Sequence, residues 1–141
     1  MSVVYVESSA VLRWLLGTPD APSMQAVLSR ATHVVTSALT TTEVGRTLQR
    51  LLATGSLSPG LRTTLWRTYS GTAARWDVFA VSDDVLRRAT DPFPVEPLRT
   101  LDAVHVATAE IYSRQVTPVT VLSVDERVRD NAEALGLAVA P

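Results

Sequence analysis

Residues 119–139, VTVLSVDERVRDNAEALGLAV, contain the pattern that decides the fold. Aliphatic and β-branched residues over Val119–Ser123 predict a strand, Glu126–Leu135 is predicted to form a helix, and Leu137–Val139 predicts a second strand. Gly136 suits the left-handed residue that ends a helix. Two short strands joined by a helix are typical of a parallel pair, because parallel strands need a crossover connection.

The same alternation of short β-rich runs and longer helical patterns extends back to the N-terminus. It predicts an α/β fold in which helices flank a central, mainly parallel sheet. The Pro-dense segment 91–97, DPFPVEP, is predicted to be a loop. The further predicted strands are Val3–Val6, His33–Ser37 and Val78–Val81. The further predicted helices are Ser9–Leu16, Pro22–Ala31, Thr41–Ala53, Pro59–Arg75, Asp84–Ala89 and Thr100–Arg114.

Length and composition predict one folded domain over residues 1–141. The chain has a mass of 15.2 kDa, with 46% hydrophobic and 19% charged residues, which is more apolar surface than a disordered chain leaves exposed. The first residues carry no basic leader, and no apolar run approaches the roughly 20 residues of a membrane span. We therefore expect neither export nor membrane insertion.

Several kinds of chemistry are excluded by residue types that the chain lacks. It has no cysteine, which excludes disulfides, thiolate metal sites and thiol nucleophiles, and which makes a reducing cytoplasm the simplest setting. All 13 basic residues are arginine, so Schiff-base chemistry and a phosphate-binding Walker lysine are excluded. A net charge of −1 argues against a uniformly basic surface for nucleic acid.

Acidic residues follow the predicted strands at the edge where ligands bind in open α/β sheets. Glu7 follows Val3–Val6 directly, and Asp125 follows the strand of the deciding segment. Glu43 is expected in the first helical turn after the strand HVVTS and a linker ALTTT, and Asp102 lies early in the helix after the Pro-rich loop. Taken singly, each acid has a structural explanation, as a first-turn acid favoured by the helix dipole or, for Asp125, as an N-cap.

Taken together, these four carboxylates point to a cation site. Like charges gathered at one end of a sheet repel each other at neutral pH unless a cation or protons intervene. Hard divalent cations such as Mg²⁺ take oxygen ligands, and such a site can activate water and neutralise a phosphodiester. The acids therefore predict metal-dependent phosphodiester hydrolysis.

Four sequence blocks together resemble the PIN-domain ribonucleases, especially the VapC-like toxins of type II toxin–antitoxin systems. The third block is the most specific, because Asp102, His105 and small helix-packing residues occur in one short run. The blocks are YVESSAVLRWLL (5–16), TSALTTTEVGRTLQR (36–50), RTLDAVHVATA (99–109) and TVLSVDERVRDNAEALGL (120–137).

The resemblance implies a PIN-like three-layer α/β/α fold and a cytoplasmic endoribonuclease that depends on Mg²⁺ or Mn²⁺. It further implies a homodimer that a small cognate VapB-like antitoxin neutralises. The family's catalytic, metal-binding acids fall on Glu7, Glu43, Asp102 and Asp125. In one departure, the family usually has aspartate where this chain has Glu7, whose longer side chain puts direct metal ligation in question.

Two serines and two arginines are further candidates for the site. Ser8 resembles a family hydroxyl that bonds a carboxylate or a metal-bound water, but it could equally be the N-cap of the first helix. Ser123 lies two residues before Asp125, on the same side of the strand end, and could support the site or simply end the strand. Arg99 and Arg46 are candidates for RNA phosphate binding, although Arg46 could instead pair with Glu43 within its helix.

His105 and three aromatic residues in or directly after the fourth predicted helix are expected to be structural. Asp102 and His105 have the spacing of a metal pair, but the resemblance places His105 in helix packing, which we prefer. Trp66, Tyr69 and Trp76 could stack on bases, yet aromatics at helical spacing more often pack a core or a dimer surface.

Two other functions remain open at the level of sequence. Glu7 could mark a PIN-like scaffold that binds RNA or a partner protein without cleaving it. Carboxylate–metal chemistry also does not read the 2′-hydroxyl, so a DNA nuclease is a third possibility.

Overall fold

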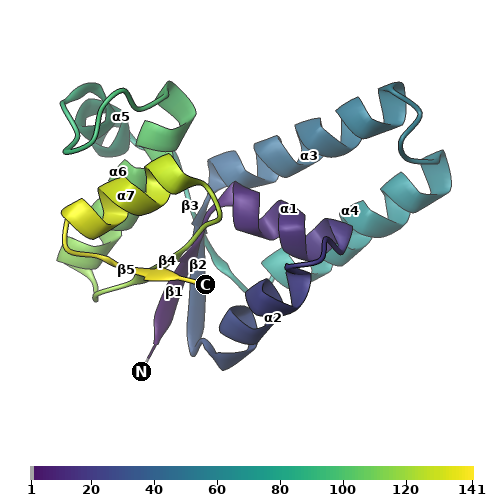
Figure 1. Ribbon diagram of the computed structural model, residues 1–141, viewed down its shortest axis with the longest axis horizontal. Coiled ribbons are helices and arrows are strands. Elements are labelled where there is room, and N and C mark those ends of the chain that lie inside the picture. The colour runs from purple at the N-terminus through teal and green to yellow at the C-terminus, as the bar shows by residue number, and fades with distance from the viewer. Residues whose placement is uncertain (1) are drawn as a thin grey trace.

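The computed structural model describes residues 2–141, and its centre is a five-stranded parallel sheet (Figure 1). The strand order is β3-β2-β1-β4-β5, and every neighbouring pair is parallel. The bounds are β1 Val3–Val6, β2 His33–Ser37, β3 Asp77–Phe79, β4 Thr120–Leu122 and β5 Ala138–Ala140.

Within residues 2–141, seven helices cover the two faces of this sheet, so the predicted three-layer α/β/α arrangement is confirmed. Figure 1 shows α1 to α4 on one side and α5 to α7 on the other, with α3 and α4 forming a long pair that extends away from the sheet. No helix within residues 2–141 is both long and apolar enough to cross a membrane. The bounds are α1 Ser8–Leu16, α2 Ala21–Arg30, α3 Ala38–Ala53, α4 Pro59–Ala73, α5 Asp83–Thr90, α6 Thr100–Gln115 and α7 Glu126–Ala134.

The central strand β1 is buried on both faces, which explains its uninterrupted apolar sequence. Val3 and Tyr5 pack in the core beneath α5, α6 and α7. Val4 and Val6 point to the opposite face and pack with residues of α1 to α4. Because side chains alternate along a strand, the four residues VVYV supply both cores at once.

The strand order places a topological switch point between β1 and β4. The chain runs from β1 outward to β2 and β3, then crosses over to β4 on the other side of β1. Connections leaving β1 and β4 therefore diverge at their carboxyl ends, and this is where α/β sheets open a crevice for ligands. Glu7 follows β1 at this point, and its backbone N–H continues the pairing by donating to the Leu122 carbonyl at 3.0 Å.

All five strands and seven helices predicted from the sequence are present within residues 2–141; β1 and β2 match their predicted bounds, and no end of any element moves by more than three residues. The largest difference is the start of α3, which was expected at Thr41 and begins at Ala38. Ser37 ends β2 and caps α3, its hydroxyl accepting from the Leu39 N–H at 3.0 Å. The expected linker ALTTT is thus helical, and Glu43 lies in the second turn of α3 rather than the first.

Candidate acidic site at the switch point

Glu7 is the N-cap of α1 and is buried, with 3% of its surface exposed. One carboxylate oxygen, Oε1, accepts from the Ser8 hydroxyl at 2.8 Å and from the Ser9 N–H at 3.0 Å. The other, Oε2, accepts from the Ser123 hydroxyl at 2.7 Å and from the Ser9 hydroxyl. Four donors fill the acceptor positions of a carboxylate, so Glu7 is fully bonded by the protein itself.

The serines around Glu7 join the ends of β1 and β4. The Ser9 hydroxyl accepts from the Val124 N–H, and the Ser123 hydroxyl accepts from the Asp125 N–H, both at 3.1 Å. Each hydroxyl therefore donates to Glu7 while accepting from the loop that follows β4. This network fixes where the β4–α7 loop begins.

Asp125 is the N-cap of α7, which confirms the structural role considered for it. Its Oδ1 accepts from the N–H groups of Arg127 and Val128 at 3.0 and 3.1 Å. Within residues 2–141 its Oδ2 accepts no hydrogen bond. Capping and a functional role are compatible, since capping uses only one of the two oxygens.

Asp102 lies in the first turn of α6, three residues after the Arg99 N-cap. Burial raises the pKa of its carboxyl, and the charges of Asp125 and Glu7 raise it further, while His105 and Arg99 act in the opposite direction. The charges of Asp125 and Glu7 therefore oppose the ionisation of Asp102.

Glu43 reaches the same region from α3. Its Oε1 lies 2.5 Å from Nε2 of His105, whose Nδ1 is 2.8 Å from the Tyr5 hydroxyl. His105 is buried, as expected for a packing residue, but it also bonds directly to a predicted site acid. The expectation that His105 only packs was therefore incomplete.

Three of the four acids line an open cavity of about 380 Å³. Glu43, Asp102 and Asp125 contribute to it, together with Arg99. A neighbouring cavity of about 310 Å³ shares Arg99, Asp102 and Asp125 and is also lined by Arg127. The shared residues make the two cavities one groove that is acidic at its centre and has arginine at its rim.

The oxygen donors of this groove fit a hard divalent cation. The carboxylate of Asp102 accepts no hydrogen bond from residues 2–141, and Glu43 and Asp125 each keep one free oxygen. The same residues do not close into a ready-made group of three ligands around one point. Mg²⁺ needs only one or two carboxylates, with waters and substrate phosphates completing its shell. Glu7, in contrast, offers no free acceptor position.

Of the other predicted site residues, the two serines contact Glu7, and one of the two arginines lines the groove. Ser8 and Ser123 both donate to Glu7, and Ser8 is not the cap of α1, because Glu7 takes that place. Arg99 lines the groove, whereas Arg46 is exposed and, within the described chain, forms no ion pair with Glu43. The aromatic residues Trp66, Tyr69 and Trp76 pack in the core beside α1 to α4, as preferred.

The sequence did not reveal the part played by Ser9. Its hydroxyl touches Glu7, Ser123 and the Val124 backbone. The available signal was its position two residues after an N-cap, where the backbone N–H bonds the capping side chain.

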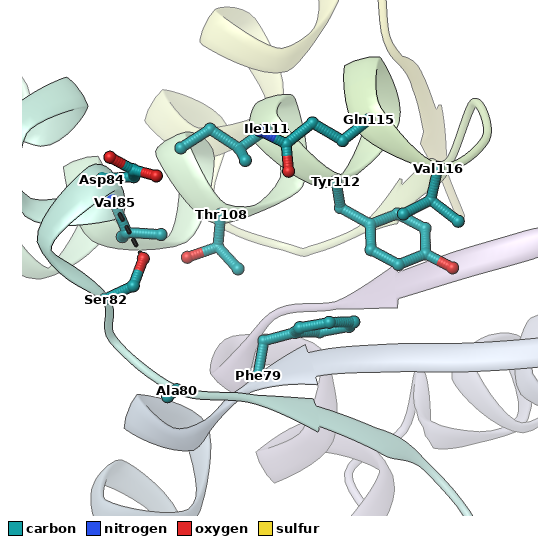
Figure 2. Close-up of a pocket in the computed structure, with 10 residues that line it drawn as sticks. All are labelled: Phe79, Ala80, Ser82, Asp84, Val85, Thr108, Ile111, Tyr112, Gln115 and Val116. Atoms are coloured by element: carbon teal, nitrogen blue, oxygen red, sulfur yellow. Dashed lines mark hydrogen bonds between the residues drawn. The ribbon is translucent and has the colours of Figure 1, made fainter.

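A separate hollow of about 250 Å³ lies between the end of β3, the start of α5 and the C-terminal half of α6 (Figure 2). Figure 2 shows the Phe79 ring below the Tyr112 ring, and the two rings pack edge to face with their centroids 5.2 Å apart. Its only carboxylate, Asp84, forms an ion pair with Arg87. This hollow is apolar and lacks the groups for hydrolysis, which leaves the acidic groove as the candidate active site.

Comparison with known proteins decides the family. The sequence model of the PIN-domain family matches residues 4–135, which is nearly the whole chain. The chain belongs to the PIN-domain family. This PIN domain is 33% identical over 140 residues to "Ribonuclease VapC35" of Mycobacterium tuberculosis, covering 97% of this chain and 95% of the relative. It is 34% identical over 139 residues to "Ribonuclease VapC46" of the same species, covering 99% and 97%.

Solved structures confirm the PIN fold at lower sequence identity. The VapC20 toxin of Mycobacterium tuberculosis, described as cleaving the sarcin–ricin loop, has a TM-score of 0.67 and 15% identity, over 98% of this chain and 99% of that one. VapBC2 of Rickettsia felis, bound to a DNA fragment from its promoter, has a TM-score of 0.64 and 10% identity, over 97% and 96%.

The raised pKa of Asp102 predicts how stability depends on pH without metal. Because its pKa lies above the ordinary value of 3.8, the folded PIN domain binds this proton more tightly than the unfolded chain does. Ionised Asp102 therefore lowers stability above its folded pKa, and this penalty fades as the pH falls through that value. We expect metal-free Asp102→Asn to melt at a higher temperature than the wild type at pH 7, with the gap closing toward pH 4. Melting curves recorded with chelator measure this difference in melting temperature. A difference that stays constant between pH 7 and pH 4 would contradict a raised pKa for Asp102.

Proposed function

We propose that this PIN domain is a metal-dependent endoribonuclease that acts as the toxin of a toxin–antitoxin pair. The observation that carries the proposal is the groove in which Glu43, Asp102 and Asp125 face one cavity beside Arg99. The ribonuclease names of relatives that match nearly the full chain support RNA as the substrate. The alternative of a non-cleaving scaffold is not favoured, because Glu7 keeps the negative charge of the usual aspartate and the other three acids remain open to the groove.

Asp102 and Glu43 would anchor the divalent cation, and Asp125 would offer its free oxygen from the other side of the groove. Mg²⁺ or Mn²⁺, when bound, supplies a nucleophilic water at neutral pH and neutralises phosphodiester charge. Glu7 adds negative charge and, through Ser8, Ser9 and Ser123, holds the strand ends that carry the site.

The arginines at the rim of the groove would bind the RNA substrate. Arg99 lines both cavities, is exposed and forms no ion pair with another residue of the described chain. Its guanidinium can therefore bind an RNA phosphate next to the acids. Arg46 is exposed and lies one turn after Glu43 on α3, where it would bind a further RNA phosphate.

The test is cleavage of single-stranded RNA by the purified protein, freed of any antitoxin, with Mg²⁺, with Mn²⁺ and with chelator. Cleavage is expected with a divalent ion and none with chelator. Cleavage that persists in chelator would overturn the metal-dependent mechanism. A DNA strand of the same sequence should stay intact, and preferential DNA cleavage would overturn the assignment to RNA.

Two partners are proposed, and each rests on its own observation. A cognate VapB-like antitoxin is supported by the VapBC complex whose toxin shares this fold. A homodimer is supported by apolar side chains exposed around the hollow of Figure 2, including Phe79 and Val116. The proposed place of action is the cytoplasm, where RNA is available. The absence of cysteine from the chain is compatible with this reducing compartment.

Arg99→Ala should weaken RNA binding and lower its salt dependence. Losing one phosphate contact reduces the slope of log affinity against log salt by about 0.7 for a single strand. Binding is measured by fluorescence anisotropy with a short labelled RNA on an Asp102→Asn background, which prevents cleavage. Arg30→Ala, an exposed arginine of α2, serves as the control. Equal losses in both variants would show a general charge effect and remove Arg99 from the site.

A further inference from the structure

We propose that Tyr5 and His105 form a buried hydrogen-bonded relay that positions the carboxylate of Glu43 for cation binding. The inference rests on the proposed function in taking Glu43 as part of the cation site. It concerns three residues that lie on separate elements: Tyr5 on β1, Glu43 on α3 and His105 on α6.

The relay is continuous from the middle of the sheet to the groove. The Tyr5 hydroxyl is 2.8 Å from His105 Nδ1, and His105 Nε2 is 2.5 Å from Glu43 Oε1. Tyr5 is fully buried, the His105 side chain is 0% exposed and the Glu43 side chain is 24% exposed. The chain of bonds thus runs outward and ends on the one member that meets solvent and lines the cavity.

When the imidazole of His105 is neutral, the donors and acceptors of the relay can be arranged in only one way. A carboxylate only accepts, so His105 donates its Nε2–H to Glu43. Nδ1 is then an acceptor, and the Tyr5 O–H donates to it. The tyrosine thereby fixes the tautomer that the carboxylate requires, and the edge-on packing of the two rings, 6.1 Å apart, holds the orientation.

Apolar packing alone does not explain why a tyrosine hydroxyl and a histidine imidazole are buried here. Burying a hydroxyl and an imidazole is costly unless each is hydrogen-bonded, and an aliphatic pair would fill the same space without that cost. What the polar pair adds is a fixed carboxylate: Oε1 is held by His105, and Oε2 accepts no hydrogen bond from residues 2–141. Partners that orient a ligating side chain typically change metal affinity by 10–100-fold when removed.

Tyr5→Phe removes the hydroxyl and keeps the ring, so it tests the relay with little change in packing. We expect Mn²⁺ affinity, measured by calorimetry, to fall about tenfold. A second readout needs no metal: ¹⁵N spectra of the metal-free protein should show His105 protonated at Nε2 in the wild type, and the signal of the unprotonated Nδ1 should shift in Tyr5→Phe because this nitrogen loses its hydrogen-bond donor. His105→Gln, whose amide reaches as far as Nε2, should retain more Mn²⁺ affinity than His105→Asn, whose amide reaches only Nδ1.

Tyr69→Phe is the matched control. Tyr69 is equally buried, and its hydroxyl bonds the Thr41 hydroxyl at 2.9 Å, away from His105. A purely structural role for Tyr5 predicts that both phenylalanine variants lower the melting temperature while Mn²⁺ affinity stays unchanged, and that result overturns the relay. Protonation of wild-type His105 at Nδ1 also overturns it. If the wild type binds no Mn²⁺ and cleaves no RNA, the proposed function fails, whereas the tautomer still decides the hydrogen-bond relay.

Discussion

Asp102→Asn should reduce RNA cleavage roughly a thousandfold while leaving the fold intact. Of the three predicted acids that line the groove, Asp102 is the one whose carboxylate accepts no hydrogen bond from residues 2–141, so both of its oxygens are available to a cation. The amide keeps the shape but loses the charge, and losing several kcal/mol of charge stabilisation in the transition state corresponds to about this factor. Initial rates on a defined RNA with saturating Mg²⁺ measure the effect.

Asp130→Asn is the control for this substitution, because Asp130 is an exposed acid on α7 outside the groove. It should cleave at the wild-type rate. In cells, expression of the wild type should arrest growth and Asp102→Asn should relieve the arrest. An Asp102→Asn protein that folds and cleaves within tenfold of the wild type would contradict the assignment of the site.

Glu7→Ala should lower the free energy of unfolding by about 3 kcal/mol, because it removes the acceptor of four hydrogen bonds in a buried position. Three serine hydroxyls and the Ser9 N–H lose a partner, and α1 loses its N-cap, itself worth about 1 kcal/mol. Relief of the repulsion with Asp102 offsets part of the loss. For a domain of this size the melting temperature should fall by roughly 10 °C.

Two variants separate this effect from a simple change of charge. Glu126→Ala removes an exposed first-turn acid of α7 and should change stability by less than about 0.5 kcal/mol. Glu7→Gln keeps one carbonyl acceptor and should lie between Glu7→Ala and the wild type. Chemical denaturation of the metal-free proteins gives the three values. A loss below 1 kcal/mol in Glu7→Ala would show that the serine network does not hold the ends of β1 and β4.

Much of the fold could be predicted because single segments carry strong local signals. Val3–Val6 is apolar throughout because both faces of β1 are covered, and Gly136 ends α7 with a positive φ of 84°. The start of α3 could not be predicted in the same way. The threonines of ALTTT disfavour a helix interior, but the Ser37 cap and the bond from the Thr36 hydroxyl to the Val6 carbonyl place the helix start there.

The acids of the candidate site could be predicted from the sequence, but the way in which the protein bonds them could not. The rule that ligands bind beyond the carboxyl ends of the strands brought Glu7 and Asp125 to one edge of the sheet, where the structure places both. It could not show that Glu7 is fully bonded by the protein, since this depends on Ser123, 116 residues away. Nor could it connect His105 with Glu43 and Tyr5, which are 62 and 100 residues distant in sequence. Such contacts arise from tertiary packing rather than from any local pattern.

The central claim is that the acidic groove binds a divalent cation through its open carboxylates. Titrating Mn²⁺ into the metal-free protein by calorimetry tests it most directly. The account predicts saturable binding to the wild type, unchanged in Asp130→Asn and abolished in Asp102→Asn. A wild type that binds no ion, or an Asp102→Asn variant that binds it equally well, would contradict the account.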